Sequence, residues 1–168
     1  AAELKAGDEL LDCGFGFADQ DMFWCERFGV GKITGLNLSA SQVVQARRRV
    51  AERGLADRID LREGSATRMP VADASCDKVT ALEAAFHYDT REDFFREAFR
   101  VLRPGGCLAT TDVLPLPGSE QRFGGRDLLG RLGDRIVRQV WQIPAANMYD
   151  RDAYARKLSA AGFSDGRV

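Results

Sequence analysis

Short apolar runs alternate with amphipathic stretches along most of the chain, and this alternation constrains the fold more than any other feature. The apolar runs predict strands at 9–13, 32–36, 58–61, 78–82 and 107–113. Helical spacing of apolar residues between these runs predicts connecting helices. Strands and helices that alternate in this way build a parallel sheet with helices on its faces, so the sequence predicts an α/β fold.

Capping signals indicate where the predicted helices begin. A first helix is expected at about 19–28, Ser39 and Gln42 have the spacing of a capping box, and Thr90 is followed by Glu92 and Asp93. Asp150 or Asp152 is expected to cap the last helix. The side chains expected to face the core are Val43, Val44, Val50 and Ala51 from the second helix and Phe94, Phe95, Ala98, Phe99 and Leu102 from the third.

The turn after the first strand carries alternating glycines, Gly14 and Gly16, followed by Ala18. Glycines at this place allow a nucleotide-like ligand to approach the backbone closely at the carboxyl edge of the sheet. A pair of glycines alone is equally compatible with a tight strand–helix turn that binds nothing.

Carboxylates around this turn favour one kind of ligand. A dinucleotide fingerprint would have a third glycine where Asp19 stands, and Asp12, Asp19 and Asp21 would repel a diphosphate. S-adenosylmethionine (SAM) carries an ammonium and a sulfonium and no phosphate. We therefore expect SAM as the cofactor, with Asp12 binding its amino group directly or through water.

Segment 11–18 resembles the first motif of class I SAM-dependent methyltransferases, and 63–70, 76–79 and 100–106 resemble later motifs in the same order. The stretch 81–88, together with Gly64, Ser65 and Ala66, is most similar to small-molecule methyltransferases that modify macrolide sugars, polyketides and terpenoids. The resemblance implies these cofactor-binding residues: Asp12, Gly14, Phe15, Gly16, Asn37, Leu38, Gln42, Ser65, Ala66 and Glu83.

Two positions depart from the family pattern. Asn37 stands where the family usually has an acid that binds both ribose hydroxyls, and Ser65 stands where an acid often faces the adenine amino group. Both residues keep hydrogen-bonding capacity but remove a charge, which affects cofactor affinity more than cofactor identity.

The resemblance also implies a division of the single domain. Residues 1–113 are expected to form the SAM-binding, Rossmann-like, doubly wound core, residues 114–149 an acceptor-binding lid, and residues 150–168 the last helix and the start of a sixth strand. By this comparison the chain is expected to lack the last two strands and the N-terminal helices, as a piece of a longer protein with an open edge beside the fifth strand.

His87 and Asp112 are the candidate catalytic residues. His87 is the only histidine, and it lies just past the fourth strand, where a general base for a hydroxyl acceptor is needed. Similarity to sugar O-methyltransferases implies that Asp112 orients His87 or binds the acceptor hydroxyl, although capping of the next turn is an equal alternative. Glu83 is expected to contact the methionine part of SAM rather than to act as the base.

Aromatic side chains are dense near the same edge. Those considered for the sulfonium site are Phe15, Phe17, Trp24, Phe86 and Tyr88, and each has packing of strand ends as its plainer explanation. In the expected lid, Trp141, Ile143, Met148 and Tyr149 suggest an apolar acceptor surface. The lid arginines Arg122, Arg126, Arg131, Arg135 and Arg138 either bind an anionic acceptor or form a solvated helix face.

Composition narrows the classes of partner. The net charge of −1 gives no basic surface for nucleic acid, and no apolar run has the length of a membrane span. Four scattered cysteines with one histidine predict no metal site and a reducing, cytoplasmic location. A small-molecule acceptor is the expected partner, and the sequence is compatible with a homo-oligomer.

These observations favour a methyltransferase that acts on a hydroxyl of a hydrophobic natural product. The alternatives are C-methylation of an isoprenoid or alkene, a SAM-binding module without catalysis, and a nicotinamide oxidoreductase.

Overall fold

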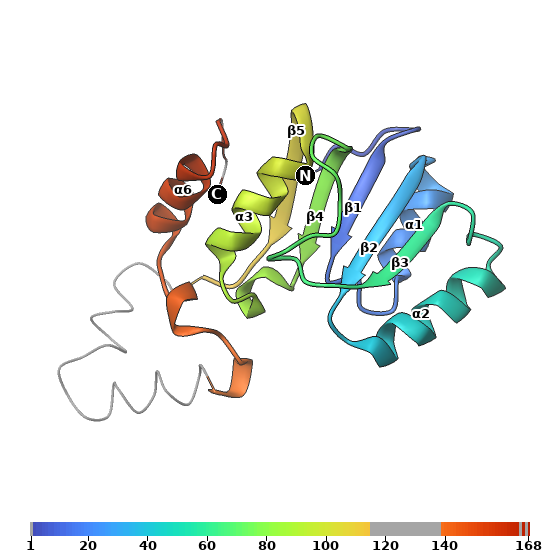
Figure 1. Ribbon diagram of the computed structural model, residues 1–168, viewed down its shortest axis with the longest axis horizontal. Coiled ribbons are helices and arrows are strands. Elements are labelled where there is room, and N and C mark those ends of the chain that lie inside the picture. The colour runs from blue at the N-terminus through green and yellow to red at the C-terminus, as the bar shows by residue number, and fades with distance from the viewer. Residues whose placement is uncertain (1, 115–138, 165, 167) are drawn as a thin grey trace.

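The computed structural model describes residues 2–114, 139–164, 166 and 168. Five strands form one parallel sheet in the order β3-β2-β1-β4-β5 (Figure 1). The strands are β1 (Glu9–Cys13), β2 (Lys32–Asn37), β3 (Ile59–Glu63), β4 (Cys76–Leu82) and β5 (Leu102–Thr111). The chain reverses its direction of winding between β3 and β4, so the predicted α/β, Rossmann-like fold is confirmed.

The helices begin where the local signals predict. They are α1 (Asp19–Phe28), α2 (Ala40–Glu52), α3 (Arg91–Val101) and α6 (Arg151–Ala160), with short 3₁₀ turns η1 (Ala85–His87) and η2 (Ala145–Asn147). Ser39, Thr90 and Asp150 cap α2, α3 and α6 through their side chains, and Thr90 forms a complete capping box with Asp93.

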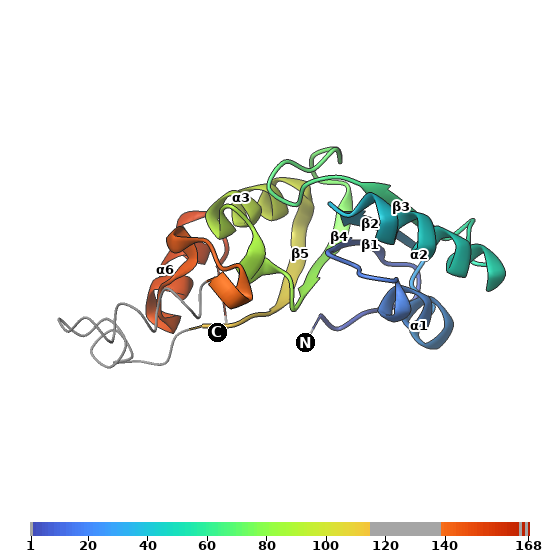
Figure 2. The same cartoon turned by 90° about the horizontal axis from the view of Figure 1, so that it is seen from below.

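Two hydrophobic cores lie on the two faces of the sheet, because successive residues of a strand point to opposite sides. Leu10 packs in the core formed with α1 and α2, whereas its neighbour Leu11 packs in the core formed with α3 and α6. Figure 2 shows α1 and α3 on opposite sides of the sheet. This double layer fixes the carboxyl edge of the strands as the rim of the site.

Some sequence expectations need correction. Val44 and Ala51 of α2 are exposed, and Ala46 takes the inward position because it shares a helical face with Val43 and Val50. Phe99 is 47% exposed and contacts Phe163 edge to face.

The boundaries of the last strands also differ from expectation. Strand β5 begins at Leu102 instead of residue 107, with an irregular register to β4, and ends at Thr111. The described residues after Phe163 form no strand, and β5 is one of the two edge strands of the described sheet, with β3 at the other edge.

The predicted lid falls mostly outside the described residues. This includes the expected helix positions Leu128, Leu132 and Ile136, whereas Val140 and Trp141 are described and exposed. Within the described parts of the chain, no helix has the length and apolar character needed to cross a bilayer.

Candidate functional site

A cavity of about 510 Å³ lies at the carboxyl edge of the sheet. Nine predicted site residues line it: Gly14, Gly16, Asn37, Leu38, Gln42, Ser65, Ala66, Glu83 and His87. Six further lining residues were not among the predicted cofactor or catalytic residues: Leu36, Gly64, Thr67, Ala84, Tyr88 and Asp89. Gly64, Thr67, Ala84 and Tyr88 lie within the motif segments 63–70 and 81–88, whereas Leu36 and Asp89 lie one position outside the predicted residues and motifs.

The glycine turn after β1 forms one side of the cavity. Gly14 has a φ of 88°, and a Cβ atom there would lie 2.6 Å from the Cβ of Ala84. Gly16 has a φ of 56°, and no atom lies within 4 Å of the place where its Cβ would stand. The turn therefore needs glycine for its conformation and presents bare backbone to a ligand.

Asn37 at the end of β2 is held by two neighbours. Its Nδ2 donates a hydrogen bond to Gln42 Oε1 at 2.9 Å, and its Oδ1 accepts one from the Ser39 N–H at 3.0 Å. Among the described residues, no other group bonds to the second Nδ2 hydrogen or the second lone pair of Oδ1, which leaves both for ligand hydroxyls. A neutral amide thus fills the place of the acid expected from the family.

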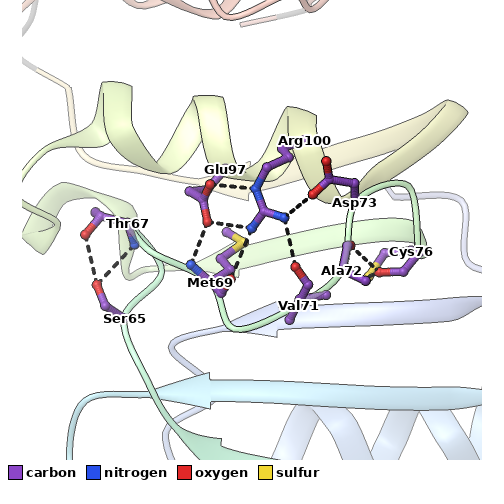
Figure 3. Close-up of polar contacts among 10 residues, drawn as sticks. Ser65, Thr67, Met69, Val71, Ala72, Asp73, Cys76, Glu97 and Arg100 are labelled. Atoms are coloured by element: carbon purple, nitrogen blue, oxygen red, sulfur yellow. Dashed lines mark hydrogen bonds and ion pairs between the residues drawn. The ribbon is translucent and has the colours of Figure 1, made fainter.

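The loop after β3 is fixed to α3 from behind. Arg100 donates hydrogen bonds to the carbonyl oxygens of Met69 and Val71, and Glu97 accepts one from the Met69 N–H (Figure 3). Ser65 Oγ lies 2.9 Å from Thr67 Oγ1 and accepts a hydrogen bond from the Thr67 N–H (Figure 3). These bonds set the position of the backbone that forms this wall of the cavity.

The segment after β4 brings Glu83 and His87 to the opposite wall. Glu83 has a φ of 52°, a left-handed conformation that is strained for a residue with a side chain, and its N–H donates to Thr111 Oγ1 at 2.9 Å. The exposed His87 ring lies 4.1 Å from the Phe86 ring, centroid to centroid. The Trp141 ring contacts the Phe86 ring edge to face, with 6.3 Å between the two centroids.

The charge of the lining fits a cationic ligand. Among the described residues that line the cavity, Glu83 and Asp89 are the carboxylates, and none is a lysine or arginine. Diphosphates are usually bound by basic side chains or helix N-termini, whereas an ammonium and a sulfonium are stabilised by carboxylates. The residues present therefore fit SAM better than a dinucleotide.

Two predicted cofactor residues, Asp12 and Phe15, do not line the cavity. Asp12 is fully buried, and its carboxylate accepts hydrogen bonds from Thr80 Oγ1 at 2.6 Å and from Gln20 Nε2 at 2.9 Å. Phe15 packs in the core below the turn, beside Gly35. Both residues support the turn from beneath, and the expected contact of Asp12 with the amino group of the cofactor, directly or through water, stays a prediction.

The aromatic and acidic neighbours of the turn also differ from expectation. Of the five aromatic residues considered for the sulfonium site, Tyr88 alone lines the cavity among the described residues.

The two carboxylates of the first helix differ in their surroundings. Asp19 is paired with Arg49 on the surface, and the hydrogen bond from Arg49 lowers the pKa of Asp19. Asp21 is buried, and among the described residues no N–H group or hydroxyl donates a hydrogen bond to its carboxylate. Burial, together with the neighbouring Asp12, raises the pKa of Asp21 well above the usual value. The residues that line the cavity, instead of Asp19 and Asp21, therefore disfavour a diphosphate.

We expect Asp21→Asn to stabilise the protein at pH 8 by about 1–3 kcal/mol, because the amide avoids a buried negative charge beside Asp12 and can donate a hydrogen bond to it. Because folding raises the pKa of Asp21, the native protein loses stability as the pH rises from the unfolded pKa of this group, near 3.8, through its folded pKa. The gain should vanish near pH 4, and urea unfolding at both pH values measures it. Asp19→Asn, an exposed control on the same helix, should change stability by less than about 0.5 kcal/mol. Destabilisation of Asp21→Asn at pH 8 would contradict the assignment.

Asp112 lies just after β5 and pairs with Arg91. Its two oxygens accept from Arg91 Nε at 2.9 Å and Arg91 Nη2 at 2.8 Å, and the two side chains are 6% and 0% exposed. In the described part of the chain, Asp112 forms no hydrogen bond with His87. The ion pair with Arg91 takes the place of the expected contact by which Asp112 would orient His87. A contact between Asp112 and the acceptor stays a prediction.

Residues 11–110 match the family model of the methyltransferase domain. The chain belongs to this family. Erythromycin 3''-O-methyltransferase of Saccharopolyspora erythraea is 42% identical over the whole chain, which covers 54% of that relative. The 27-O-demethylrifamycin SV methyltransferase of Amycolatopsis mediterranei is 40% identical over 82% of the chain and 50% of its own length. This methyltransferase domain thus spans about half the length of these curated relatives.

A solved structure of geranyl diphosphate methyltransferase in complex with SAM has the same fold. Its TM-score is 0.77, at 26% identity over 94% of the chain and 58% of that structure. Together with the family match over residues 11–110, this likeness identifies SAM as the cofactor of the methyltransferase domain.

Proposed function

We propose that this chain is the cofactor-binding and catalytic part of a methyltransferase that transfers the methyl group of SAM to a hydroxyl of a hydrophobic natural product. The acceptor class is a macrolide, a polyketide or a sugar attached to one. The observation that carries the proposal is the position of His87 on the same cavity as the glycine turn and the two lining carboxylates. The similarity to macrolide and rifamycin O-methyltransferases supports this choice of acceptor.

His87 is the general base of the proposed reaction. When bound, SAM supplies a methyl group on a positively charged sulfur. His87 takes the hydroxyl proton while the oxygen bonds to the methyl carbon, and the carbon–sulfur bond breaks with its electron pair left on sulfur. Trp141, whose exposed ring contacts Phe86 beside His87, provides apolar surface for the acceptor, and Glu83 faces the cationic part of the cofactor. Alignment of the acceptor contributes much of the rate enhancement in such a displacement.

The proposed partner is therefore a small molecule, and the net charge of −1 gives no support for nucleic acid. Four free cysteines support a reducing compartment such as the cytoplasm.

A transfer assay tests the proposal. The purified chain is incubated with SAM labelled in its methyl group and a macrolide that has a free 3''-hydroxyl, and mass spectrometry locates the label. We expect a methyl ether, together with calorimetric binding of SAM and of its demethylated product. Binding of SAM without transfer to a panel of hydroxyl acceptors would instead favour a binding module. Binding of NAD without SAM would favour an oxidoreductase.

C-methylation of an isoprenoid diphosphate is the second candidate, favoured by the likeness to geranyl diphosphate methyltransferase. The arginines considered for a diphosphate, at 122, 126, 131, 135 and 138, lie outside the described residues. Geranyl diphosphate in the same assay distinguishes the two, because a new carbon–carbon bond in the product would overturn O-methylation.

A further inference from the structure

We propose that Asn147 is a positioning residue for His87. This inference rests on the proposed function only in the role it gives to His87, and the contacts themselves do not depend on it. Asn147 is in η2, is 1% exposed, and lies 60 positions after His87 in the chain. Its Nδ2 donates hydrogen bonds to the carbonyl oxygens of Phe86 at 3.1 Å and Tyr88 at 2.6 Å. One buried amide therefore holds the peptide on both sides of the histidine.

The turn that carries His87 has little stability of its own. It is a single 3₁₀ turn, η1, in which the His87 N–H donates to Ala84 O and the Tyr88 N–H donates to Ala85 O. Short 3₁₀ turns have poor hydrogen-bond geometry and depend on their surroundings. The carbonyl oxygens of Phe86 and Tyr88 take no part in these two bonds and accept hydrogen bonds from Asn147 instead. The buried amide thus fixes the backbone, while the His87 ring remains exposed in the cavity.

Asn147 is itself held from behind by Arg91. The Arg91 N–H donates to Asn147 Oδ1 at 3.1 Å, and Arg91 Nη1 donates to the Asn147 carbonyl oxygen. Arg91 is in turn fixed by Asp112 and by the carbonyl oxygen of Val113. With both Nδ2 hydrogens and Oδ1 engaged, Asn147 has one orientation, as expected for a fully satisfied buried network.

The same segment is connected to the cofactor side of the cavity. Tyr88 Oη donates a hydrogen bond to the carbonyl oxygen of Cys13, which begins the glycine turn, at 2.8 Å. Residues 86–88 are therefore held from Asn147 on one side and from β1 on the other. This places His87 at a fixed position relative to the turn that binds SAM, which general base catalysis requires.

Asn147→Asp tests the inference with little change of shape. It keeps the oxygen that accepts from the Arg91 N–H but removes both donors to residues 86 and 88. We expect kcat for the macrolide with a free 3''-hydroxyl to fall about 10- to 100-fold, the range for a misplaced catalytic group, with the Kd of SAM changed less than about twofold. Asn147→Ser, which keeps one donor, should give an intermediate loss and replaces the first variant if Asn147→Asp does not fold.

A second readout does not depend on turnover. Because His87 is the only histidine, its Cε1 proton gives one signal in the NMR spectrum, and the nearby Phe86 ring makes its chemical shift sensitive to position. We expect this signal to move in Asn147→Asp. Tyr154→Phe is the matched control. It removes the hydrogen bond between Tyr154 Oη and Thr110 Oγ1, and the Tyr154 ring lies against Arg91 of the same network without a hydrogen bond to residues 86–88 in the described structure. It should leave both the signal and kcat unchanged.

The outcomes separate the two claims. If His87→Ala abolishes transfer while Asn147→Asp changes neither the signal nor kcat, the positioning role is wrong and the proposed function stands. If the His87 signal moves in Asn147→Asp but His87→Ala retains turnover, the positioning of the ring is supported and the general base assignment fails. Equal losses of kcat in Asn147→Asp and Tyr154→Phe would show a merely structural effect and overturn the inference.

Discussion

Replacement of His87 by alanine is expected to lower kcat for transfer to a hydroxyl acceptor by about 100- to 10,000-fold, the usual contribution of a general base. The acceptor oxygen is a poor nucleophile while it keeps its proton, and His87 is the histidine placed on the cavity wall to accept it. Steady-state rates with the macrolide that has a free 3''-hydroxyl measure the effect.

Cofactor binding separates this effect from damage to the fold. The Kd of SAM, measured by calorimetry, should change less than about twofold in His87→Ala, since the rest of the lining is untouched. His87→Gln is the matched variant, because glutamine keeps a hydrogen-bonding side chain but its amide cannot accept the proton of the acceptor hydroxyl. A rate within about threefold of the native chain in both variants would contradict the general base assignment.

Replacement of Arg91 by methionine is expected to destabilise the protein by about 3–5 kcal/mol, because it leaves the Asp112 carboxylate buried without its partner. Arg91 is fully buried and lies against the rings of Tyr149 and Tyr154, at 5.2 Å and 5.7 Å from their centroids. Urea unfolding followed by circular dichroism measures the change.

The double variant Arg91→Met/Asp112→Leu should recover part of this loss, because no unpaired charge then remains in the interior. Recovery stays incomplete, since the carbonyl oxygens of Val113 and Asn147 still lose their donor. Arg48→Met is the control: Arg48 pairs with Glu52 at 82% and 59% side-chain exposure, so its removal should cost less than about 0.5 kcal/mol. A loss below about 1 kcal/mol in Arg91→Met would contradict the role of the buried pair.

Local signals placed the helices well. Ser39 and Thr90 cap α2 and α3 as their spacing indicated, because a capping hydrogen bond joins residues only a few positions apart. The start of β5 was predicted late, since its first pairing, of Leu102 with Cys76, depends on a strand distant in sequence. The cavity residues were also largely predictable, because the motif residues lie at strand ends that a parallel sheet brings to one edge.

The polar interior was not predictable in this way. Asp12 was expected at the ligand and Asp112 beside His87, yet Asp12 is covered by Thr80 and Gln20, and Asp112 pairs with Arg91. Nothing in the local pattern distinguishes a buried Arg91, at the first turn of a helix, from an exposed one. A side chain's burial depends on which elements pack over it, and that is a property of the assembled layers.

By itself the sequence determined the α/β class, the helix starts, the glycine turn and the place of His87 just after β4, because periodicity, capping and turn chemistry act between near neighbours. The tertiary structure alone decided which polar groups are buried and with which partners. The bonds from Arg91 to Asn147 and from Thr80 to Asp12 join residues 56 and 68 positions apart. Such contacts form only after the two faces of the sheet are covered, so the support of the candidate base from Asn147 became visible only in the fold.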